Sequence, residues 1–329
     1  MFLIQKPLFF WVETPLHAGS GSDLGIVDLP IQRERHTGFP KIEGSGTKGC
    51  LRESFENKLG KDNKELNLAY GPESTDEAHA GSLGFSDARL LLFPVKSVKE
   101  VFAWITCPQV ITRFKRDLDL CSVTYDFGLP SANSVPSGCR LFVRDNRIVL
   151  EEYTFTANSN NGNGDTTKFA QWLKKYLAKG MEEFWQDKIE KDILILPDED
   201  FKDFVTMSTE VIARTKIDDN TGTVAKGALW YEEYLPADSI LYSIVFAGPV
   251  FKEKDEEKGK FKVNKDDPED KKALDNGTKP TEIEAQKVMC FFKDNLPSLL
   301  QIGGNATIGK GFVRTVFLNF PKEEVKNAE

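Results

Sequence analysis

The apolar residues of this chain occur in short runs, and glycine, proline or charged residues interrupt each run within a few positions. Runs such as Leu8–Val12, Leu90–Phe93 and Phe312–Phe317 are rich in aromatic and branched residues, which is typical of strands. Apolar residues recur at helical spacing in only a few stretches, so we expect helices over 47–59, 166–190 and 281–295. Many strands, few helices and no internal repeat predict an α+β fold.

A chain of 329 residues is long enough for one elaborated domain or two small ones. We interpret residues 1–329 as a single domain with insertions. Polar, glycine-containing residues over 60–82 predict a surface excursion, and two strand-like runs joined by a turn predict a hairpin over 209–236. Residues 251–281 are highly charged and are expected to form a mobile loop.

The composition excludes several classes of protein. The chain is 40% hydrophobic and 29% charged, which is unlike disordered or collagen-like chains. Its apolar runs fall far short of the roughly 18 residues that span a bilayer. The five cysteines are widely spaced without a C-x-x-C pair, which argues against structural zinc and a disulfide framework. We therefore expect a cytoplasmic protein that does not bind membranes.

The net charge of −8 argues against bulk binding of nucleic acid, but it is unevenly distributed. Residues 151–200 hold 6 Lys and 11 Asp or Glu, a local charge of −5. Residues 252–281 hold 9 Lys and 9 Asp or Glu and are neutral overall. The charge pattern therefore leaves room for a local basic groove.

A glycine-rich run, Gly44-Ser45-Gly46-Thr47-Lys48-Gly49, precedes the first expected helix and satisfies the G-x-G-x-x-G pattern. One interpretation is a dinucleotide site that uses Gly44, Gly46 and Gly49. That site needs a parallel strand ending in an acid soon after the helix, and none is apparent in the sequence. A second interpretation is a helix N-terminus where Lys48 and Arg52 grip a phosphate, including a nucleic-acid backbone. A tight turn with a solvated Lys48 is the third.

A second glycine-rich loop lies near the C-terminus, where Gly303-Gly304 is followed by Gly309-Lys310-Gly311. Glycine lets a backbone approach a phosphate closely, and Lys310 supplies a cation. Such a loop is often an ordinary turn, but two of them favour a polyphosphate or RNA backbone as ligand.

Several polar residues are candidates for chemistry. His17 and Asp28 lie in glycine-rich surroundings after the first strand, where an isolated Asp is usually a turn residue. Glu232-Glu233 lies at the base of the expected hairpin and is either solvated or faces a site as a metal-binding or proton-transferring carboxylate. Farther along the hairpin, Arg214, Lys216 and Trp230 suit base stacking combined with phosphate contact; packing against the body is the alternative.

Five motifs together carry a resemblance to a known family: His17–Pro40, Gly44–Gly49, Phe85–Pro94, Gly227–Pro236 and Gly303–Arg314. They closely resemble the backbone subunit of the Cmr complex, the type III-B CRISPR effector built from proteins of the repeat-associated mysterious protein (RAMP) superfamily. The likeness covers nearly the whole chain; the segments 60–82, 155–166 and 251–281 are peculiar to this sequence. The resemblance implies a modified ferredoxin-like, or RRM-like, core with a thumb hairpin and inserted finger segments.

The resemblance also implies a function. Copies of the chain would stack as a helical filament along the CRISPR guide RNA, with other Cmr subunits, and would cleave complementary single-stranded target RNA at regular intervals. Each thumb would kink the guide–target duplex and flip out a nucleotide. The chain would be a divalent-metal-dependent endoribonuclease using Mg²⁺ or Mn²⁺. The alternatives are a nuclease-inactive scaffold subunit and a stand-alone dinucleotide-binding enzyme.

Residue roles follow from the same resemblance. The family's catalytic aspartate falls on Asp28, which is also the candidate metal ligand. His17 lies near the site, and Glu232 and Tyr234 fall where the family has assisting residues at the thumb base. The resemblance implies RNA contacts from both glycine-rich loops and the first helix, and the residues of the hairpin add the contacts argued above. The expected RNA-binding residues are Gly44, Ser45, Gly46, Thr47, Lys48, Arg52, Arg214, Lys216, Trp230, Gly303, Gly304 and Lys310.

Overall fold

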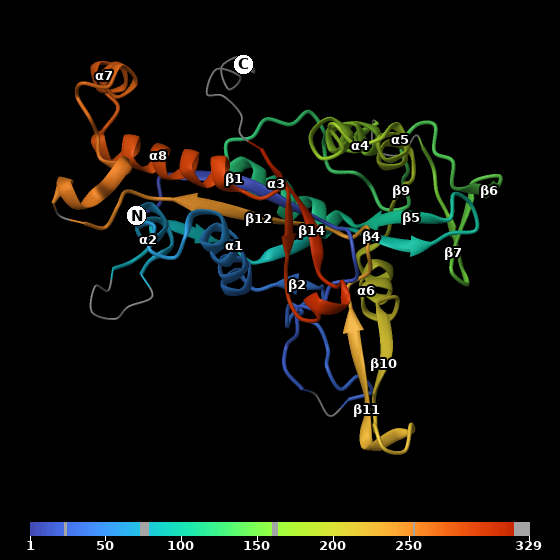
Figure 1. Cartoon of the computed structure of the whole chain (residues 1–329). Helices are drawn as coiled ribbons and strands as arrows, with labels where there is room; N and C mark the ends of the chain where they lie inside the picture. The colour runs from blue at the N-terminus through green and yellow to red at the C-terminus, as the bar shows by residue number, and fades with distance from the viewer. Residues whose placement is uncertain (23–24, 73–78, 160–163, 253, 319–329) are drawn as a thin grey trace.

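A computed structural model describes residues 1–22, 25–72, 79–159, 164–252 and 254–318 of the chain. Part of the expected surface excursion and part of the 155–166 segment therefore lie outside the described residues, as do two positions of the His17–Pro40 motif, Asp23 and Leu24. The structure is a mixed α+β fold (Figure 1), as the sequence predicts.

A nine-stranded sheet forms the centre of the molecule, with strand order β13-β14-β1-β12-β4-β5-β9. The short strand β2 pairs with β4, and β3 pairs with β12. All pairs are antiparallel except β5–β9. The strands are β1 (Ile4–Val12), β2 (Lys41–Ile42), β3 (Leu83–Phe85), β4 (Ala88–Lys96), β5 (Phe102–Thr106), β9 (Ile193–Ile195), β12 (Ile240–Ala247), β13 (Leu299–Gln301) and β14 (Phe312–Phe317).

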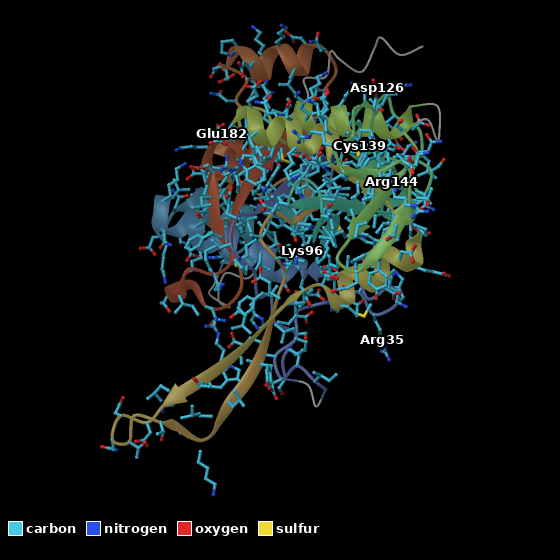
Figure 2. All side chains as sticks on the ribbon, turned by 90° about the vertical axis from the view of Figure 1, so that its right-hand side faces the viewer. Arg35, Lys96, Asp126, Cys139, Arg144 and Glu182 are labelled. Carbon is cyan, nitrogen blue, oxygen red and sulfur yellow. The ribbon has the colours of Figure 1, made fainter. Side chains whose placement is uncertain are left out.

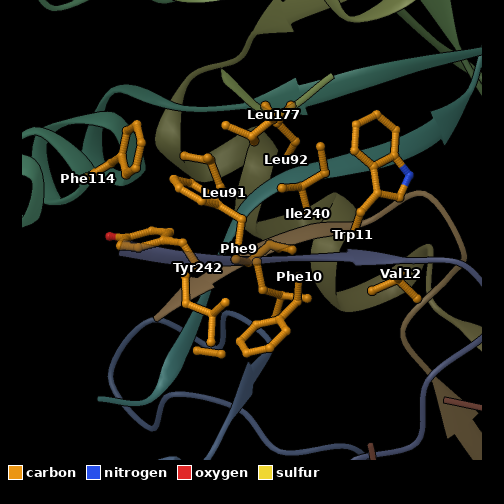
Figure 3. Close-up of a cluster of buried hydrophobic side chains, with 14 of the residues drawn as sticks. Phe9, Phe10, Trp11, Val12, Leu91, Leu92, Phe114, Leu177, Ile240 and Tyr242 are labelled. Atoms are coloured by element: carbon orange, nitrogen blue, oxygen red, sulfur yellow. The ribbon is translucent and has the colours of Figure 1, made fainter. Parts of the chain in front are cut away.

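Strand β1 lies between β12 and β14, and its apolar run is buried on both faces of the sheet. Phe9 packs against Phe114 of helix α3, with ring centroids 6.0 Å apart, and Trp11 packs edge-on against Trp104 at 5.4 Å. Phe10 lies on the other side of the strand (Figure 3). A strand covered on both faces needs a continuous apolar run, which explains the sequence of β1.

Helices supply the two covering layers. Helix α3 packs on β4, and the Trp172 and Trp185 side chains of α4 and α5 join Phe9 and Trp11 on one face. Phe55 of α1 and Phe292 of α8 stack on the opposite face, 5.9 Å apart. The helices are α1 (Gly44–Leu59), α2 (Lys64–Tyr70), α3 (Pro108–Leu120), α4 (Asp165–Tyr176), α5 (Glu183–Lys191), α6 (Asp198–Met207), α7 (Pro268–Asp275) and α8 (Pro280–Asn295).

The described residues contain more helix than the sequence suggested. The expected helix over 166–190 is two helices, α4 and α5, because Gly180 between them has a φ of +81°. Within the expected excursion 60–82, helix α2 buries Leu66, Ala69 and Tyr70. The expected first helix is confirmed, although it begins three residues earlier than predicted and ends at Gly60 as expected.

The charged segment 251–281 is also more ordered than a loop. It contains the 3-10 helix η1 (Asp255–Phe261) and α7. Lys258 pairs with Glu284 at 2.8 Å, and Lys287 pairs with Asp270 at 2.5 Å. Both acids are nearly fully buried, so the alternating charges form specific pairs with helix α8 instead of a solvated run.

Two smaller sheets extend from the body. Strands β6 (Phe142–Arg144), β7 (Arg147–Leu150) and β8 (Tyr153–Thr156) form one, and the predicted hairpin, β10 (Glu210–Ile217) with β11 (Val224–Tyr234), forms the other. The β10–β11 hairpin projects away from the central sheet in both views (Figures 1 and 2). In the part of the chain that the structure describes, the helices are too short or too polar to cross a membrane.

Candidate functional site at the base of the hairpin

Strand β11 presents different chemistry on its two faces at the base of the hairpin. Side chains alternate along a strand, so Trp230, Glu232 and Tyr234 share one face while Tyr231 and Glu233 share the other. Both glutamates are buried, with 6% and 5% exposure. The interpretation of Glu232-Glu233 as solvated acids is therefore wrong, because each carboxylate is held by partners from other segments.

Glu232 is the centre of a polar network on the first face. Its Oε1 accepts a hydrogen bond from Trp230 Nε1 at 2.9 Å. Its Oε2 accepts from the Tyr234 hydroxyl, from Asn305 Nδ2 at 2.9 Å and from Arg214 Nε at 3.3 Å. The Tyr234 oxygen in turn accepts from Asn305 Nδ2 and Arg214 Nη2, each at 2.8 Å. The hairpin and the C-terminal glycine-rich loop are thus joined through one carboxylate and one phenol.

This network holds Glu232 as a carboxylate. Burial by itself raises the pKa of Glu232, but hydrogen bonds from Trp230, Tyr234 and Arg214 outweigh burial, so the pKa lies below its ordinary value. The pKa of Tyr234 is raised by burial and by its hydrogen bond to Glu232. The site therefore carries a fixed negative charge beside a neutral phenol, with the Arg214 guanidinium next to both.

Asp28 reaches the hairpin from the loop that follows β1. Its Oδ2 accepts the backbone N–H of Tyr231 at 2.8 Å. Leu29 N donates to the Tyr231 carbonyl, and Glu233 N donates to the Leu29 carbonyl, each at 3.0 Å. Residues 28–29 thus act as a short parallel strand on the free edge of β11. The Asp28 side chain is exposed, and Oδ1 accepts no hydrogen bond from the described residues.

His17 lies beside the network. Its Nδ1 is 2.7 Å from the carbonyl oxygen of Glu233, which can only accept, so Nδ1 carries the proton and donates. In the neutral imidazole, Nε2 is then the unprotonated nitrogen. The ring lies 5.5 Å from the ring of Tyr234. A Cβ on Gly19 would come within 2.8 Å of Nε2, so a glycine at this position leaves room for the imidazole.

The C-terminal glycine-rich loop closes the site from the other side. Gly304 N donates to the His17 carbonyl at 3.0 Å. Gly303 has a φ of +81°, and a Cβ there would overlap the same carbonyl oxygen, so this contact requires glycine. Lys310 Nζ lies 5.2 Å from the centroid of the Tyr234 ring. The structure therefore brings this predicted loop together with His17, Glu232 and Tyr234.

The first glycine-rich run lies within α1, whose first amide is already occupied, because Gly44 N donates to Asp87 Oδ1 at 2.9 Å. Ser45 and Gly46 are exposed, while the Thr47 side chain is fully buried. Lys48 is partly buried and forms no ion pair with a described residue. Burial, and then the nearby Arg52 charge, lower the pKa of Lys48.

The two glycine-rich segments are neighbours in space. Burial raises the pKa of the Cys50 thiol on α1. A hydrogen bond between this thiol and the backbone of Gly303 lowers the same pKa, so Cys50 and Gly303 are in contact. The N-terminal turns of α1 thus adjoin the loop that holds His17.

Two of the expected RNA-binding residues lie apart from this centre. Arg52 is engaged within the fold, since it contacts Glu56 at 2.6 Å, Asn67 at 3.1 Å and the Gly71 carbonyl. Its guanidinium joins α1 to α2. Lys216 is exposed farther out on β10.

The dinucleotide interpretation of G-x-G-x-x-G is wrong. Its glycines should lie in the turn between a parallel strand and a helix. In the structure Gly44, Gly46 and Gly49 are inside α1, the preceding strand β2 is two residues long and antiparallel to β4, and the helix is followed by α2.

Two residues of the site, Asn305 and Arg33, were missed at the sequence level. Asn305 adopts a left-handed conformation with φ of +66°, and an Asn directly after two glycines is a signal for such a turn. Glu233 was named with Glu232 as a candidate carboxylate, but the resemblance assigned a role only to Glu232. Arg33 pairs with Glu233 at 2.5 Å, a contact across 200 positions that no local pattern indicates.

The described residues do not contain a cluster of three or more His, Cys, Asp or Glu side chains that could hold a metal ion. Asp28 is therefore not part of such a cluster among the described residues. Mg²⁺ in phosphate chemistry is commonly bound by one or two carboxylates together with substrate phosphates and water, so one exposed carboxylate fits such an ion only when RNA is also present.

Comparison with known proteins agrees with this architecture. The sequence profile of the RAMP superfamily matches residues 10–314. The chain is 37% identical over 308 residues to the CRISPR system Cmr endoribonuclease Cmr4 of Pyrococcus furiosus, covering 92% of this chain and 91% of the relative. It is 26% identical to the CRISPR system CMR subunit Cmr4 of Saccharolobus solfataricus, covering 97% and 98%.

Solved structures agree in fold. The oligomeric Cmr4 of Pyrococcus furiosus superposes with a TM-score of 0.68 at 28% identity, over 97% of this chain and 99% of that one. A chain of the type III-B Cmr-beta complex bound to cognate target RNA also gives 0.68, at 20% identity, over 98% and 99%. At that identity the second match speaks for the fold alone.

Proposed function

Since this chain belongs to the RAMP superfamily and, within it, to the Cmr4 family, we propose that it is the backbone endoribonuclease of a type III-B CRISPR effector. Copies of it line the guide RNA together with other Cmr subunits and cleave complementary target RNA at regular intervals. The observation that carries the proposal is the convergence of Asp28, His17, Glu232 and Tyr234 at the base of a projecting hairpin.

The domain architecture of the chain is also part of the proposal. We propose that residues 1–329 are one RAMP-type domain with a modified ferredoxin-like core, whose thumb is the β10–β11 hairpin. Two features support this assignment: the hairpin projects beyond the sheet, and the profile match spans the core and the hairpin alike. The excursion 60–82 and the charged segment 251–281 are insertions in this domain.

The RNA path runs along the cationic side of the site. Lys48, Lys310 and Arg214 lie on α1, the C-terminal loop and the hairpin, and the first two segments are neighbours through Cys50 and Gly303. Positive groups on adjoining segments match the phosphates of a strand laid across them. This strip accounts for RNA binding by a chain of net charge −8.

Asp28 is proposed as the catalytic residue, because its side chain is exposed while its Oδ2 and the backbone of the next residue, Leu29, are fixed on β11. Oδ1 can take the proton of the target 2′-hydroxyl or can ligate a divalent cation, Mg²⁺ or Mn²⁺. When bound with RNA, such a cation supplies charge neutralisation at the scissile phosphate. In the 2′-hydroxyl route the 2′-oxygen loses its proton to Asp28 and bonds to phosphorus, the bond to the 5′-oxygen breaks, and that oxygen takes a proton from water.

The buried neighbours then have positioning roles. Glu232 and Tyr234 satisfy one another's hydrogen bonds and hold Asn305 and Arg214 at the edge of the site. His17 presents Nε2 as an acceptor, because Nδ1 is committed to a carbonyl. A kinked RNA backbone beside these groups would place the 2′-oxygen in line with phosphorus.

The test is cleavage of an end-labelled RNA complementary to the guide by the reconstituted complex, with wild type beside Asp28→Asn and with or without EDTA. We expect a regularly spaced ladder that the variant and EDTA both abolish, while guide binding and assembly persist. A ladder that survives EDTA removes the cation from the proposal. Stable assembly with no wild-type ladder makes the chain a nuclease-inactive scaffold and assigns cleavage to another subunit.

A further inference from the structure

We propose that the Arg33–Glu233 ion pair is a positioning clamp that holds the Asp28 loop against the hairpin. This inference rests on the proposed function, because it concerns how the cleaving carboxylate is placed. The pair lies on the face of β11 opposite the Glu232 network, so neither residue belongs to the polar cluster described above.

Through its carboxylate, Glu233 contacts three residues in two segments, the loop after β1 and the start of the hairpin. Oε1 accepts from Arg33 Nη2 at 2.5 Å and from Thr209 Oγ1 at 2.8 Å, and Oε2 accepts from the backbone N–H of Ile31 at 3.0 Å. Its backbone adds two more contacts, since Glu233 N donates to the Leu29 carbonyl and its own carbonyl accepts from His17. One residue thus touches both sides of the loop that carries Asp28.

Arg33 anchors the far end of the same loop to the body of the protein. Its Nη1 donates to the Gly38 carbonyl at 2.8 Å and to the Val205 carbonyl of α6 at 2.9 Å. The guanidinium therefore links three parts of the structure, namely the loop, helix α6 and the hairpin base.

The loop needs such an anchor because its tip is solvent-exposed. Ile26, two residues before Asp28, is 95% exposed, and Asp28 is itself exposed. At its base the loop is closed by hydrogen bonds of its own, from Ser20 N to the Pro30 carbonyl at 3.0 Å and from Gln32 N to the Ala18 carbonyl at 2.8 Å. Ile31 at the base of the loop is 4% exposed, but burial cannot hold the exposed residues around Asp28, so their position depends on hydrogen bonds to a fixed group. Glu233 is that group, being 5% exposed and fully paired.

Removing one partner of a buried ion pair leaves the other charge uncompensated, so truncation at either residue should release the loop. A misplacement of about 1 Å at a reacting group can cost on the order of 100-fold in rate. We therefore expect Glu233→Ala to lower the single-turnover cleavage rate about 100-fold in the reconstituted complex, while target-RNA affinity stays within about twofold of wild type.

A second set of variants separates positioning from folding. Arg33→Lys keeps the charge but has fewer donors, and we expect it to cleave about tenfold faster than Arg33→Ala. The double variant Arg33→Ala/Glu233→Ala should be no slower than either single variant, because the two residues act as one unit. Hydrogen exchange should rise in the amides of residues 28–33 and remain unchanged in β1 and β12.

Glu284→Ala is the matched control. Glu284 is 4% exposed, pairs with Lys258 at 2.8 Å and accepts the Val250 N–H at 3.3 Å, so it resembles Glu233 in burial and partners. It lies on α8, on the opposite side of the body from the hairpin (Figure 1). Its removal should leave cleavage and exchange over 28–33 unchanged.

The outcomes are separable from those of the proposed function. Suppose that Asp28→Asn is inactive, as the proposed function requires. The clamp is then refuted if Glu233→Ala cleaves at the wild-type rate, or if its RNA affinity falls by the same factor as its cleavage rate. If Asp28→Asn still cleaves, the proposed function fails. In every case unchanged exchange over 28–33 in Glu233→Ala refutes the clamp, and a local rise there supports it.

Discussion

Asp28 accepts the backbone N–H of Tyr231 across 203 positions of sequence, and this bond joins the exposed loop after β1 to the inner part of the hairpin. The amide it satisfies lies on the edge of β11 that does not face β10. The same carboxylate thus has a structural oxygen, Oδ2, and an oxygen directed to no described partner, Oδ1. Chemistry and positioning at this residue can therefore be separated by substitution.

Asp28→Asn and Asp28→Ala should differ in structure but not in activity. The Asn side chain retains an oxygen that can accept the Tyr231 amide, whereas Ala leaves that amide without its partner. Both variants lack the carboxylate, so cleavage should fall by about 10²–10⁴-fold in each. Only Asp28→Ala should show faster hydrogen exchange at Tyr231.

Asp218→Asn is a suitable control for these variants. Asp218 also accepts backbone N–H groups, from Asn220 at 2.9 Å and Thr221 at 3.0 Å, but it lies at the turn of the hairpin. Wild-type cleavage in this variant together with loss in Asp28→Asn would assign the chemistry to Asp28. Equal losses in the two would show that hairpin structure, not the Asp28 carboxylate, limits the rate.

Gly303→Ala and Gly309→Ala form a matched pair in the C-terminal loop. Both glycines have positive φ, +81° and +76°, so each substitution costs roughly 1–2 kcal/mol in backbone conformation. The Cβ at position 303 also overlaps the His17 carbonyl, whereas the one at 309 meets open space among the described residues. Gly303→Ala should therefore lower the melting temperature more and reduce cleavage, while Gly309→Ala cleaves normally. Equal cleavage in the two variants would contradict a role for this contact.

Lys48→Ala should weaken guide-RNA binding and reduce the slope of log affinity against log salt by about 1, the value for one phosphate contact. The reason is that Lys48 is partly buried near the glycine-rich loop and has no ion-pair partner among the described residues. Lys272→Ala, on an exposed position of α7, is the control and should leave the slope unchanged. An unaltered slope in Lys48→Ala would count against a phosphate contact.

The same lysine predicts a pH dependence. Burial, followed by the Arg52 charge, lowers the pKa of Lys48, so its neutral form becomes populated at a lower pH than for an ordinary lysine. RNA affinity should therefore decline as the pH is raised through that lowered pKa. Lys48→Arg stays charged and should bind RNA with a flat profile over the same range. Parallel profiles for wild type and Lys48→Arg would contradict the prediction.

The sequence predicted the hairpin, β14 and α8 well, because each has a strong local signal. The turn between β10 and β11 contains the run Asp-Asp-Asn-Thr-Gly, and the apolar residues of α8 repeat at helical spacing. Helix α3 was missed, although Pro108 at its first turn is a typical start signal. The break between α4 and α5 was missed because apolar spacing continues across Gly180 and only its positive φ interrupts it.

Four members of the candidate site could be predicted, but Asn305, Arg33 and the connections between the residues could not. The resemblance supplied Asp28, His17, Glu232 and Tyr234, whereas sequence alone favoured Asp28 as a turn residue. Contacts such as Arg33–Glu233 and Asn305–Glu232 join positions 200 and 73 residues apart. Such pairs depend on how the hairpin base meets the two loops, and neither periodicity nor composition carries that information.

Asn305→Gly tests whether the C-terminal loop contributes to the site through its side chain. Asn305 has a φ of +66°, which glycine adopts without strain, so this substitution removes the amide and leaves the backbone intact. Two hydrogen bonds are lost, one to Glu232 and one to Tyr234. A typical hydrogen bond contributes about 0.5–1.5 kcal/mol to stability, and the bond to the charged Glu232 contributes more. We expect cleavage to fall about tenfold with RNA affinity unchanged, because Glu232 keeps its other partners and only its alignment loosens. The measurement is single-turnover cleavage beside Gly309→Ala, and normal cleavage in Asn305→Gly would show that the network on this face of β11 does not depend on the loop.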